Sequence, residues 1–250
     1  MKLFGNLYNL LTVLKKLLRG KHMQENIRIE AQSQSVLATN KVLRNTYALL
    51  GLSLIPTTVG AYIGMSMSFV FAQQHPIMFA IMLMAGMFGL FFAIQANRNN
   101  SMGVVLLLAL TLFMGVMLGP ILQVAFHLSN GAQIVSLAAG GTAAIFLTLA
   151  TIATTTKKDF SFMGKFLMIG IILLILASLA NLFFQVPAMA LALSGVAVLL
   201  FSGFILYDVS RIVNGGETNY IMATLALYMN IYNLFVNLLQ LLMALLGNRD

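Results

Sequence analysis

Seven long runs of apolar residues, separated by short polar stretches, follow one another along the chain after residue 46. They cover residues 47–71, 77–96, 102–126, 132–154, 164–184, 188–210 and 220–246. An α-helix needs about 20 apolar residues to cross the hydrocarbon core of a bilayer, and each run is long enough to do so. The pattern therefore predicts an all-α, polytopic membrane protein with seven transmembrane helices.

The last run differs from the others because polar residues occur on two sides of the expected helix. One side carries carboxamides at spacings of 3, 4 and 3 residues: Asn230, Asn233, Asn237 and Gln240. The other carries hydroxyl groups at spacings of 4: Tyr220, Thr224, Tyr228 and Tyr232. Neither side can face lipid, since an unpaired polar group in hydrocarbon is costly. We therefore expect this helix at the centre of the bundle, where its carboxamides either interlock with neighbouring helices or line a hydrated pore.

Composition and charge agree with this reading. The chain of 250 residues is 60% hydrophobic and 8% charged, with a mean hydropathy of +0.94, which no ordinary soluble domain has. Its net charge is +8, and if the helices alternate in direction, all of the 14 Lys and Arg residues except Arg249 fall on one side of the membrane. By the positive-inside rule, the N-terminus is cytoplasmic and the C-terminus is periplasmic. The excess charge therefore indicates orientation in a bilayer and not binding to nucleic acid.

The residues before the first run form two segments of different character. Residues 1–21 have leucines on one helical face and Lys, Arg, Asn and Thr on the other. This predicts an amphipathic interfacial helix on the anionic inner leaflet, or else a helix that packs on the protein's own loops. Residues 22–46 are rich in polar side chains and are expected to form a cytoplasmic tether. The seven-helix transmembrane domain would then occupy residues 47–250.

The sequence contains little that would support catalysis or metal binding. It has no cysteine, and its three histidines are far apart, so we expect no metal site and no cofactor. An aspartyl protease needs two carboxylates that share a proton, and the membrane region offers a single carboxylate, Asp208. We therefore expect a protein that is not an enzyme.

Asp208 is the first candidate for a functional residue, because an ionisable group in a membrane span is costly to keep. Arg211 follows one helical turn later and could pair with it, which leaves open a purely structural ion pair at the helix end. Next come Gly215 and Gly216, which can end the helix, and Glu217, which would lie near the positive end of the last helix.

Two further patterns concern helix packing. Gly60 and Gly64 in the first span, and Gly115 and Gly119 in the third, have the GxxxG spacing that lets helices approach closely. We interpret both pairs as packing contacts rather than as dimer interfaces. Pro120 is expected to kink the third span.

The C-terminal segment 201–242, FSGFILYDVSRIVNGGETNYIMATLALYMNIYNLFVNLLQLL, resembles the signature of the Bax inhibitor-1 (transmembrane Bax-inhibitor motif) family. NKVLRNTYALLGLSL at 40–54, GPILQ at 119–123 and GGTAAIFLTLATIATTTKKDFSFMGKFLMIG at 140–170 resemble its bacterial members. The resemblance runs from about residue 38 to the C-terminus. It implies a bundle of seven helices with the last one in the centre, in the inner membrane of a bacterium.

The resemblance also implies two functions. Some bacterial members bind and modulate FtsH, the membrane-bound AAA protease of membrane-protein quality control. Others are pH-sensitive calcium leaks, whose gate is a pair of aspartates on the sixth and seventh helices. The first aspartate corresponds to Asp208, but the second position, in LYMN, is Asn230. Because an asparagine cannot ionise, the coupled titration of two carboxylates is lost here, although Asn230 could still hydrogen-bond to Asp208.

Three hypotheses follow. The first is a non-enzymatic inner-membrane protein that binds FtsH and tempers its proteolysis, with the cytoplasmic tail as the segment that the ATPase grips. The alternative is a pH-sensitive calcium or cation leak gated at Asp208. The third is a bundle in which Asp208 and Arg211 serve stability alone. The candidate residues for all three are Asp208, Arg211, Glu217, Asn230, Asn233, Asn237 and Gln240.

Overall fold

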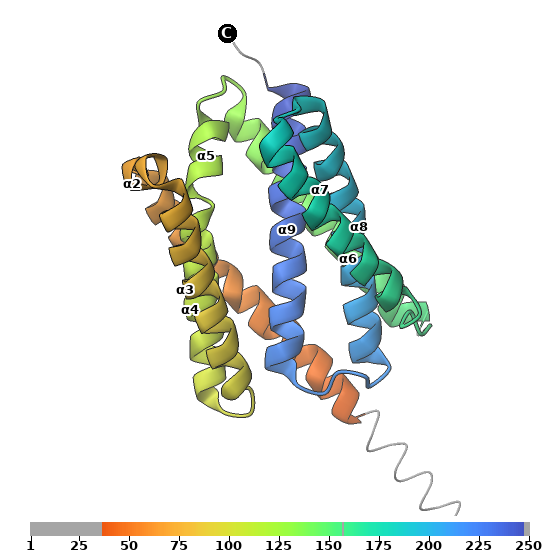
Figure 1. The fold of residues 1–250 in the computed structure, drawn as a ribbon. Coiled ribbons are helices and arrows are strands. Elements are labelled where there is room, and N and C mark those ends of the chain that lie inside the picture. The colour runs from red at the N-terminus through yellow and green to blue at the C-terminus, as the bar shows by residue number, and fades with distance from the viewer. Residues whose placement is uncertain (1–36, 157, 248–250) are drawn as a thin grey trace, which may run out of the picture. The chain divides into compact units, whose positions relative to one another are not determined.

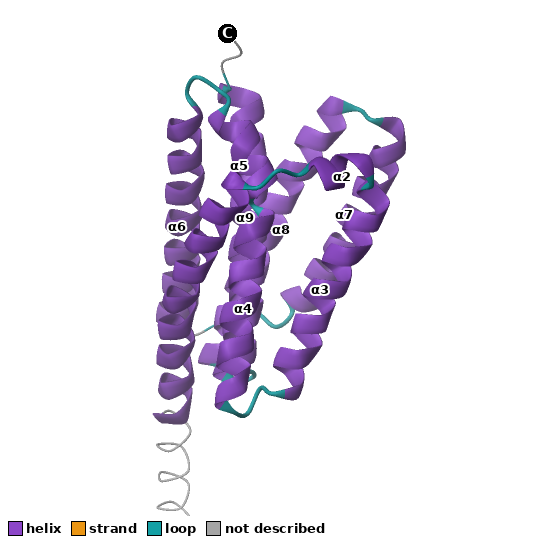
Figure 2. Ribbon diagram, turned by 90° about the vertical axis from the view of Figure 1, so that its left-hand side faces the viewer, coloured by secondary structure: helices purple, strands orange, loops and turns teal. Residues whose placement is uncertain are grey.

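The computed structural model describes residues 37–156 and 158–247, and every regular element in this part of the chain is a helix (Figure 2). Seven helical segments of the described residues are long and apolar enough to cross a membrane. The first is the Leu37–Ser66 helix, and the short α2 (Val70–Gln74) follows it. The others are α3 (Pro76–Ala96), α4 (Ser101–Met117) together with α5 (Gly119–Phe126), α6 (Gly131–Thr156), α7 (Met163–Phe184), α8 (Pro187–Val213) and α9 (Tyr220–Leu246). The predicted all-α, polytopic architecture is confirmed.

The start of the first span differs from the expectation. The helix already includes Leu37, the first described residue, so residues 37–46 of the expected tether are helical, and it ends at Ser66 rather than at residue 71. The cause is visible in the packing of residues 42–47, where Val42, Leu43 and Tyr47 lie against the core and Thr46 is fully buried. The expected interfacial helix 1–21 and the tether up to residue 36 lie outside the described residues.

The third span bends where Pro120 predicts a kink. α4 ends at Met117, Leu118 interrupts the helix, and α5 begins at Gly119 with the proline in its first turn (Figure 1). A proline lacks the N–H that would continue the preceding helix, so the break comes just before it.

The loops between the helices gather at two ends of the bundle. Loops 97–100 and 214–219 meet where Asn219 Nδ2 donates to the Arg98 carbonyl oxygen at 2.8 Å. Loop 158–162 joins them, because Ser210 Oγ donates to the Lys158 carbonyl oxygen at 3.0 Å. We call this the basic end. The opposite end carries residues 67–75, 127–130 and 185–186, and there Asn130 Nδ2 donates to the Leu246 carbonyl oxygen at 2.7 Å.

Helix α9 is surrounded by other helices, as its two polar sides predict (Figure 1). It packs against α4, α6 and α8. On its hydroxyl side, Tyr228 Oη and Thr57 Oγ1 of the Leu37–Ser66 helix share a hydrogen bond of 2.9 Å, and Tyr232 Oη donates to the Met114 carbonyl oxygen at 3.2 Å. Its carboxamide side faces α8 through Asn230 and Gln240. The polar side chains of this helix are therefore hydrogen-bonded within the protein on both sides, although Gln240, near its C-terminal end, is exposed.

The two GxxxG pairs pack against each other. A Cβ atom at Gly60 would collide with the carbonyl oxygen of Leu112, and one at Gly119 with the backbone of Gly64. The Leu37–Ser66 helix therefore contacts α4 and the start of α5 backbone to backbone, which only glycine permits. Gln123 closes this contact, because its Nε2 donates to the carbonyl oxygens of Met65 at 2.9 Å and Met67 at 3.0 Å. The glycines serve packing within one chain, as expected.

Candidate functional site

The site is centred on a hydrogen bond between α8 and α9. Asn230 Nδ2 donates to Asp208 Oδ2 at 2.7 Å. Asn230 is buried, and Asp208 is half-buried in the last two turns of α8, toward the basic end. The distance is typical of a hydrogen bond to a charged acceptor. The two positions that the family resemblance relates to a pair of aspartates are therefore in direct contact in this chain.

Arg211 lies beside Asp208, but its ion pair in the described residues is with a different carboxylate. Arg211 Nη2 is 3.9 Å from Glu217 Oε2 and donates to the Gly216 carbonyl oxygen at 3.1 Å. Its guanidinium group also lies over the Tyr207 ring, 5.7 Å from the ring centroid. Glu217 is brought back to α8 by the turn at Gly215, whose φ of 75° is the left-handed conformation expected at the end of that helix.

Asp208, Arg211 and Glu217 line a small common cavity of about 20 Å³, together with Ile212, Ala223 and Ala226. This is room for about one water molecule. Glu217 Oε1 also accepts the backbone N–H of Asn219 at 2.9 Å, next to the start of α9. Four of the seven candidate residues thus gather at the basic end of the α8–α9 interface: Asp208, Arg211, Glu217 and Asn230.

The other three carboxamides do not join this cluster. Asn233 Nδ2 and Asn237 Nδ2 each donate to a carbonyl oxygen one turn earlier in α9, at 2.8 Å in both cases. Gln240 Oε1 accepts from Ser194 Oγ of α8 at 3.0 Å. Asn237 and Gln240 line a second cavity, of about 190 Å³, with Ser178, Asn181 and Ser194 among its other walls. Gln240 is ten residues, or about 15 Å, from Asn230 along the helix, so the two polar cavities lie at different depths.

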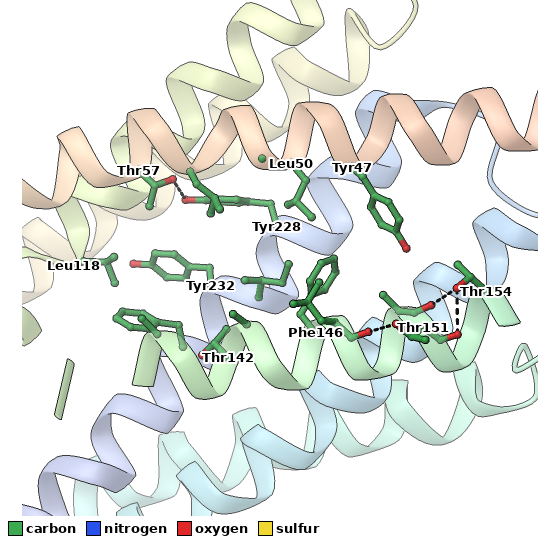
Figure 3. A pocket seen from close by; sticks show the side chains of 18 residues that line it. Tyr47, Leu50, Thr57, Leu118, Thr142, Phe146, Thr151, Thr154, Tyr228 and Tyr232 are labelled. Atoms are coloured by element: carbon green, nitrogen blue, oxygen red, sulfur yellow. Dashed lines mark hydrogen bonds between the residues drawn. The ribbon is translucent and has the colours of Figure 1, made fainter. Parts of the chain in front are cut away.

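A third cavity, of about 580 Å³, was not indicated by the sequence pattern. It lies between the Leu37–Ser66 helix, α6 and α9, and Tyr47, Phe146, Tyr228 and Tyr232 are among the side chains around it (Figure 3). Its walls come from three segments far apart in the sequence. The only local signal is a set of small residues, Gly51, Ala139 and Ala143, on faces that would otherwise pack.

One carboxylate outside the spans, that of Asp159, has a pKa shifted by its hydrogen bonds. The hydroxyl and the backbone N–H of Ser161 both hydrogen-bond to Asp159 Oδ1 in the loop after α6. These hydrogen bonds hold the pKa of Asp159 below its ordinary value, so this carboxylate stays ionised. Among the described residues, no group of three or more His, Cys, Asp or Glu side chains is placed to hold a metal ion.

Comparison with known proteins identifies the family. Residues 39–247 match the family model described as Inhibitor of apoptosis-promoting Bax1. The chain is 43% identical over 209 residues to the Modulator of FtsH protease YccA of Escherichia coli K12, which covers 83% of this chain and 92% of that protein. The Inner membrane protein YccA of Escherichia coli O6:H1 is similar to the same extent. A membrane protein of Vibrio cholerae is 42% identical over 87% of this chain and 95% of its own length. Together with the seven apolar helices, these matches show that the chain is a multi-pass membrane protein that belongs to the Bax inhibitor-1 family.

Proposed function

We propose that this protein is a non-enzymatic protein of the bacterial inner membrane that binds the protease FtsH and modulates its proteolysis. The observation that carries the proposal is the similarity to YccA, which is named a modulator of that protease and matches at 43% identity over most of both chains. A relationship of this extent preserves the fold.

The chemistry of the site supports a modulator rather than an enzyme. Asp208 is paired with a carboxamide, not with a second carboxylate, and Asn230 can neither take up nor release a proton. Arg211 and Glu217 form an ion pair with each other. Among these four residues, Asp208 is the acid outside that ion pair. None of the four carries a hydroxyl or thiol that a neighbouring base could activate as a nucleophile.

The proposed orientation places the basic end in the cytoplasm, on the side of the FtsH ATPase. Lys and Arg residues concentrate there, as the positive-inside rule requires of a cytoplasmic face. Residues 1–36 would then also be cytoplasmic, and we propose that this segment is the part of the chain that the ATPase engages.

Co-purification tests the proposal. The full-length chain, tagged at its C-terminus and extracted in mild detergent, should enrich FtsH over other inner-membrane proteins. Its overproduction should lengthen the half-life of a membrane substrate of FtsH. A second polytopic inner-membrane protein of similar size, with the same tag and expression level, is the control. Equal recovery of FtsH with both proteins, and an unchanged substrate half-life, would refute the proposal.

The contact between Asp208 and Asn230 favours one alternative, a cation leak through the α8–α9 interface with Asp208 as its gate. An ionisable group held by a single carboxamide, with a polar cavity on either side of it along the interface, is a plausible barrier to ions. Calcium flux into dye-loaded proteoliposomes tests this reading.

On the leak hypothesis, Asp208→Asn abolishes the flux, and Asn230→Asp, which restores an aspartate pair, makes it more sensitive to pH. Flux that is the same in liposomes with and without the protein would exclude the leak. If Asp208→Asn lowers only the melting temperature, and neither flux nor FtsH recovery changes, the cluster serves stability alone.

A further inference from the structure

The 580 Å³ cavity is a groove inside the membrane-spanning region with an apolar interior (Figure 3). The Leu37–Ser66 helix and α6 form its two sides, and α9 forms its floor. The two sides touch part of the way along, where the Tyr47 and Phe146 rings meet edge to face with centroids 6.1 Å apart, and the lining on α6 continues from there to Thr154, toward the basic end. Gly51 on one side is exposed, and a Cβ added there would meet nothing within 4 Å. The groove is therefore open and accessible from the bilayer.

The groove is long enough for a lipid tail. Its lining on α6 runs from Ala139 to Thr154, which corresponds to about 22 Å along the helix axis. The hydrocarbon core of one bilayer leaflet is about 15 Å thick, so a single acyl chain lying along the helices would be in contact with the groove over its whole length.

Most polar groups of the walls are hydrogen-bonded within the protein, which disfavours a polar occupant. The hydroxyl groups of the lining threonines Thr57, Thr142, Thr151 and Thr154 all donate to carbonyl oxygens of their own helices. Tyr228 and Tyr232 use their hydroxyl groups in hydrogen bonds to the protein as well. The Tyr47 hydroxyl group has no hydrogen-bond partner among the described residues, but it is buried and presents no accessible polar surface. A ligand would therefore meet mainly methyl, methylene and aromatic groups, and an acyl chain matches them.

Charge at the basic end indicates which lipid is preferred. Arg44 is exposed and lies one helical turn before Tyr47 on the same side of the helix. On the other side of the groove, α6 leads to Lys158, also exposed, and to Asp159, whose carboxylate is bound by Ser161. The basic residues are in excess there, at the depth where the head group of a lipid in the groove would lie.

We propose that this groove binds one acyl chain of an anionic phospholipid, with the head group at the basic end beside Arg44. The bound lipid then acts as a structural component that fills the wedge between the Leu37–Ser66 helix and α6. The proposal does not depend on FtsH, because it rests only on the lining of the groove and on the charges at its end.

Native mass spectrometry of the full-length protein tests the proposal. Delipidated protein is titrated with phosphatidylglycerol or with phosphatidylcholine of identical acyl chains. Wild type should bind one phosphatidylglycerol more tightly than the next ones. Gly51→Leu, which places a side chain in the open groove, should weaken that first binding step by about tenfold or more, as expected for an overfilled site. Arg44→Gln should reduce the preference for phosphatidylglycerol by about fivefold, since a surface charge contributes about 1 kcal/mol to binding an anionic lipid.

Gly89→Leu in α3 is the matched control, because Gly89 is also exposed and a Cβ there also meets nothing within 4 Å. It should bind lipid as wild type does, and both leucine variants should melt no lower than wild type, since leucine favours helix over glycine. The proposal is wrong if Gly51→Leu binds the first lipid as tightly as Gly89→Leu does. It is also wrong if successive lipids bind to wild type with equal affinity.

Discussion

Tyr47 and Tyr228 show how differently a buried hydroxyl group can contribute to stability. Tyr228 is 2% exposed, and its hydroxyl bonds to Thr57 on the neighbouring helix. The Tyr47 hydroxyl is also buried but has no hydrogen-bond partner among the described residues, and the same holds for the Thr46 hydroxyl beside it. A buried polar group without a partner costs free energy, whereas a paired one contributes stability.

The same substitution should therefore have opposite effects at the two positions. Tyr228→Phe removes a hydrogen bond and leaves Thr57 with a partner only in its own helix, so the free energy of unfolding should fall by about 1 kcal/mol. Tyr47→Phe removes an unpaired hydroxyl and keeps the contact with Phe146, so stability should be unchanged or should rise by up to about 1 kcal/mol. Thermal unfolding in detergent measures both.

Thr46→Val is a second check on the same idea, because it replaces an unpaired hydroxyl by a methyl group of similar size. It should behave like Tyr47→Phe. A clear loss of stability in both variants would mean that these hydroxyl groups have partners, such as a bound water or lipid.

At this scale the sequence identified the important residues but not their partners. Asp208 is noticeable because it is a lone acid in a span, and its contact with Asn230 followed only from the family resemblance. Arg211 could have paired with Asp208 or with Glu217, since a helical turn separates it from the first and a loop from the second. The left-handed turn at Gly215 brings Glu217 back to Arg211, so these two form the ion pair. The spacing of residues along the sequence does not indicate the direction of such a turn.

Among the elements, the contact between the Leu37–Ser66 helix and α4 is the one most restricted in residue type. Gly115 faces the backbone of Thr57, and a Cβ there would collide with the Thr57 carbonyl oxygen. Because backbone cannot move aside as a side chain can, any larger residue must push the two helices apart.

Gly115→Ala should accordingly lower stability by about 1–3 kcal/mol, the usual cost of overpacking. Gly140→Ala in α6 is the control, since a Cβ at Gly140 meets nothing within 4 Å. That change should be neutral or should stabilise the helix by up to about 1 kcal/mol. Comparison of melting temperatures in one detergent tests the pair, and equal shifts would contradict the backbone contact.

The sequence predicted the number of spans and their limits closely, because continuous hydrophobicity is a strong and local signal. It also placed the break near Pro120, because a proline lacks the N–H that would continue the preceding helix. It did not predict that residues 37–46 are helical. Val42 and Leu43 pack on the core there, but polar residues separate the apolar ones, so the segment is not continuously hydrophobic. These polar residues are Asn40, Lys41, Arg44 and Asn45. It also found both GxxxG pairs without indicating that they meet, which depends on how the spans are arranged in space.

For the molecule as a whole, the orientation in the membrane is the property that the charges predict. Loops 97–100, 158–162 and 214–219 share one end through hydrogen bonds, and basic residues concentrate there. If that end is cytoplasmic, all three loops must be cytoplasmic together.

Cysteine labelling can verify this directly, because the sequence has no cysteine of its own. Two variants are made, Asn99→Cys and Ser129→Cys, each with a single cysteine. Intact cells that produce them are treated with a membrane-impermeant maleimide. Ser129→Cys, at the opposite end, should be labelled, and Asn99→Cys should be labelled only after the cells are lysed. The reverse pattern would place the N-terminus outside and would remove the cytoplasmic tail from reach of the FtsH ATPase.

The groove is the feature that sequence reasoning could not anticipate. Small residues such as Gly51 and Ala143 are common in membrane helices. The neighbouring sequence does not show whether two such residues on adjacent helices pack together or leave a gap between the helices. The gap depends on how far apart two helices lie that touch through the Tyr47 and Phe146 rings, and this spacing is set by the arrangement of the whole bundle.

The central place of α9 has a consequence for biogenesis. This helix is the last to leave the ribosome, yet it supplies the donors for carbonyl and carboxylate oxygens on the earlier helices. Until α9 has been inserted, the core residues of the earlier helices have no central helix to pack against. Hydrogen-bond acceptors such as the Asp208 carboxylate also lack their donors on α9. A ribosome that stalls before residue 220 would leave six spans without the helix that forms the centre of the bundle, and we expect such an incomplete chain to be degraded as an unassembled membrane protein.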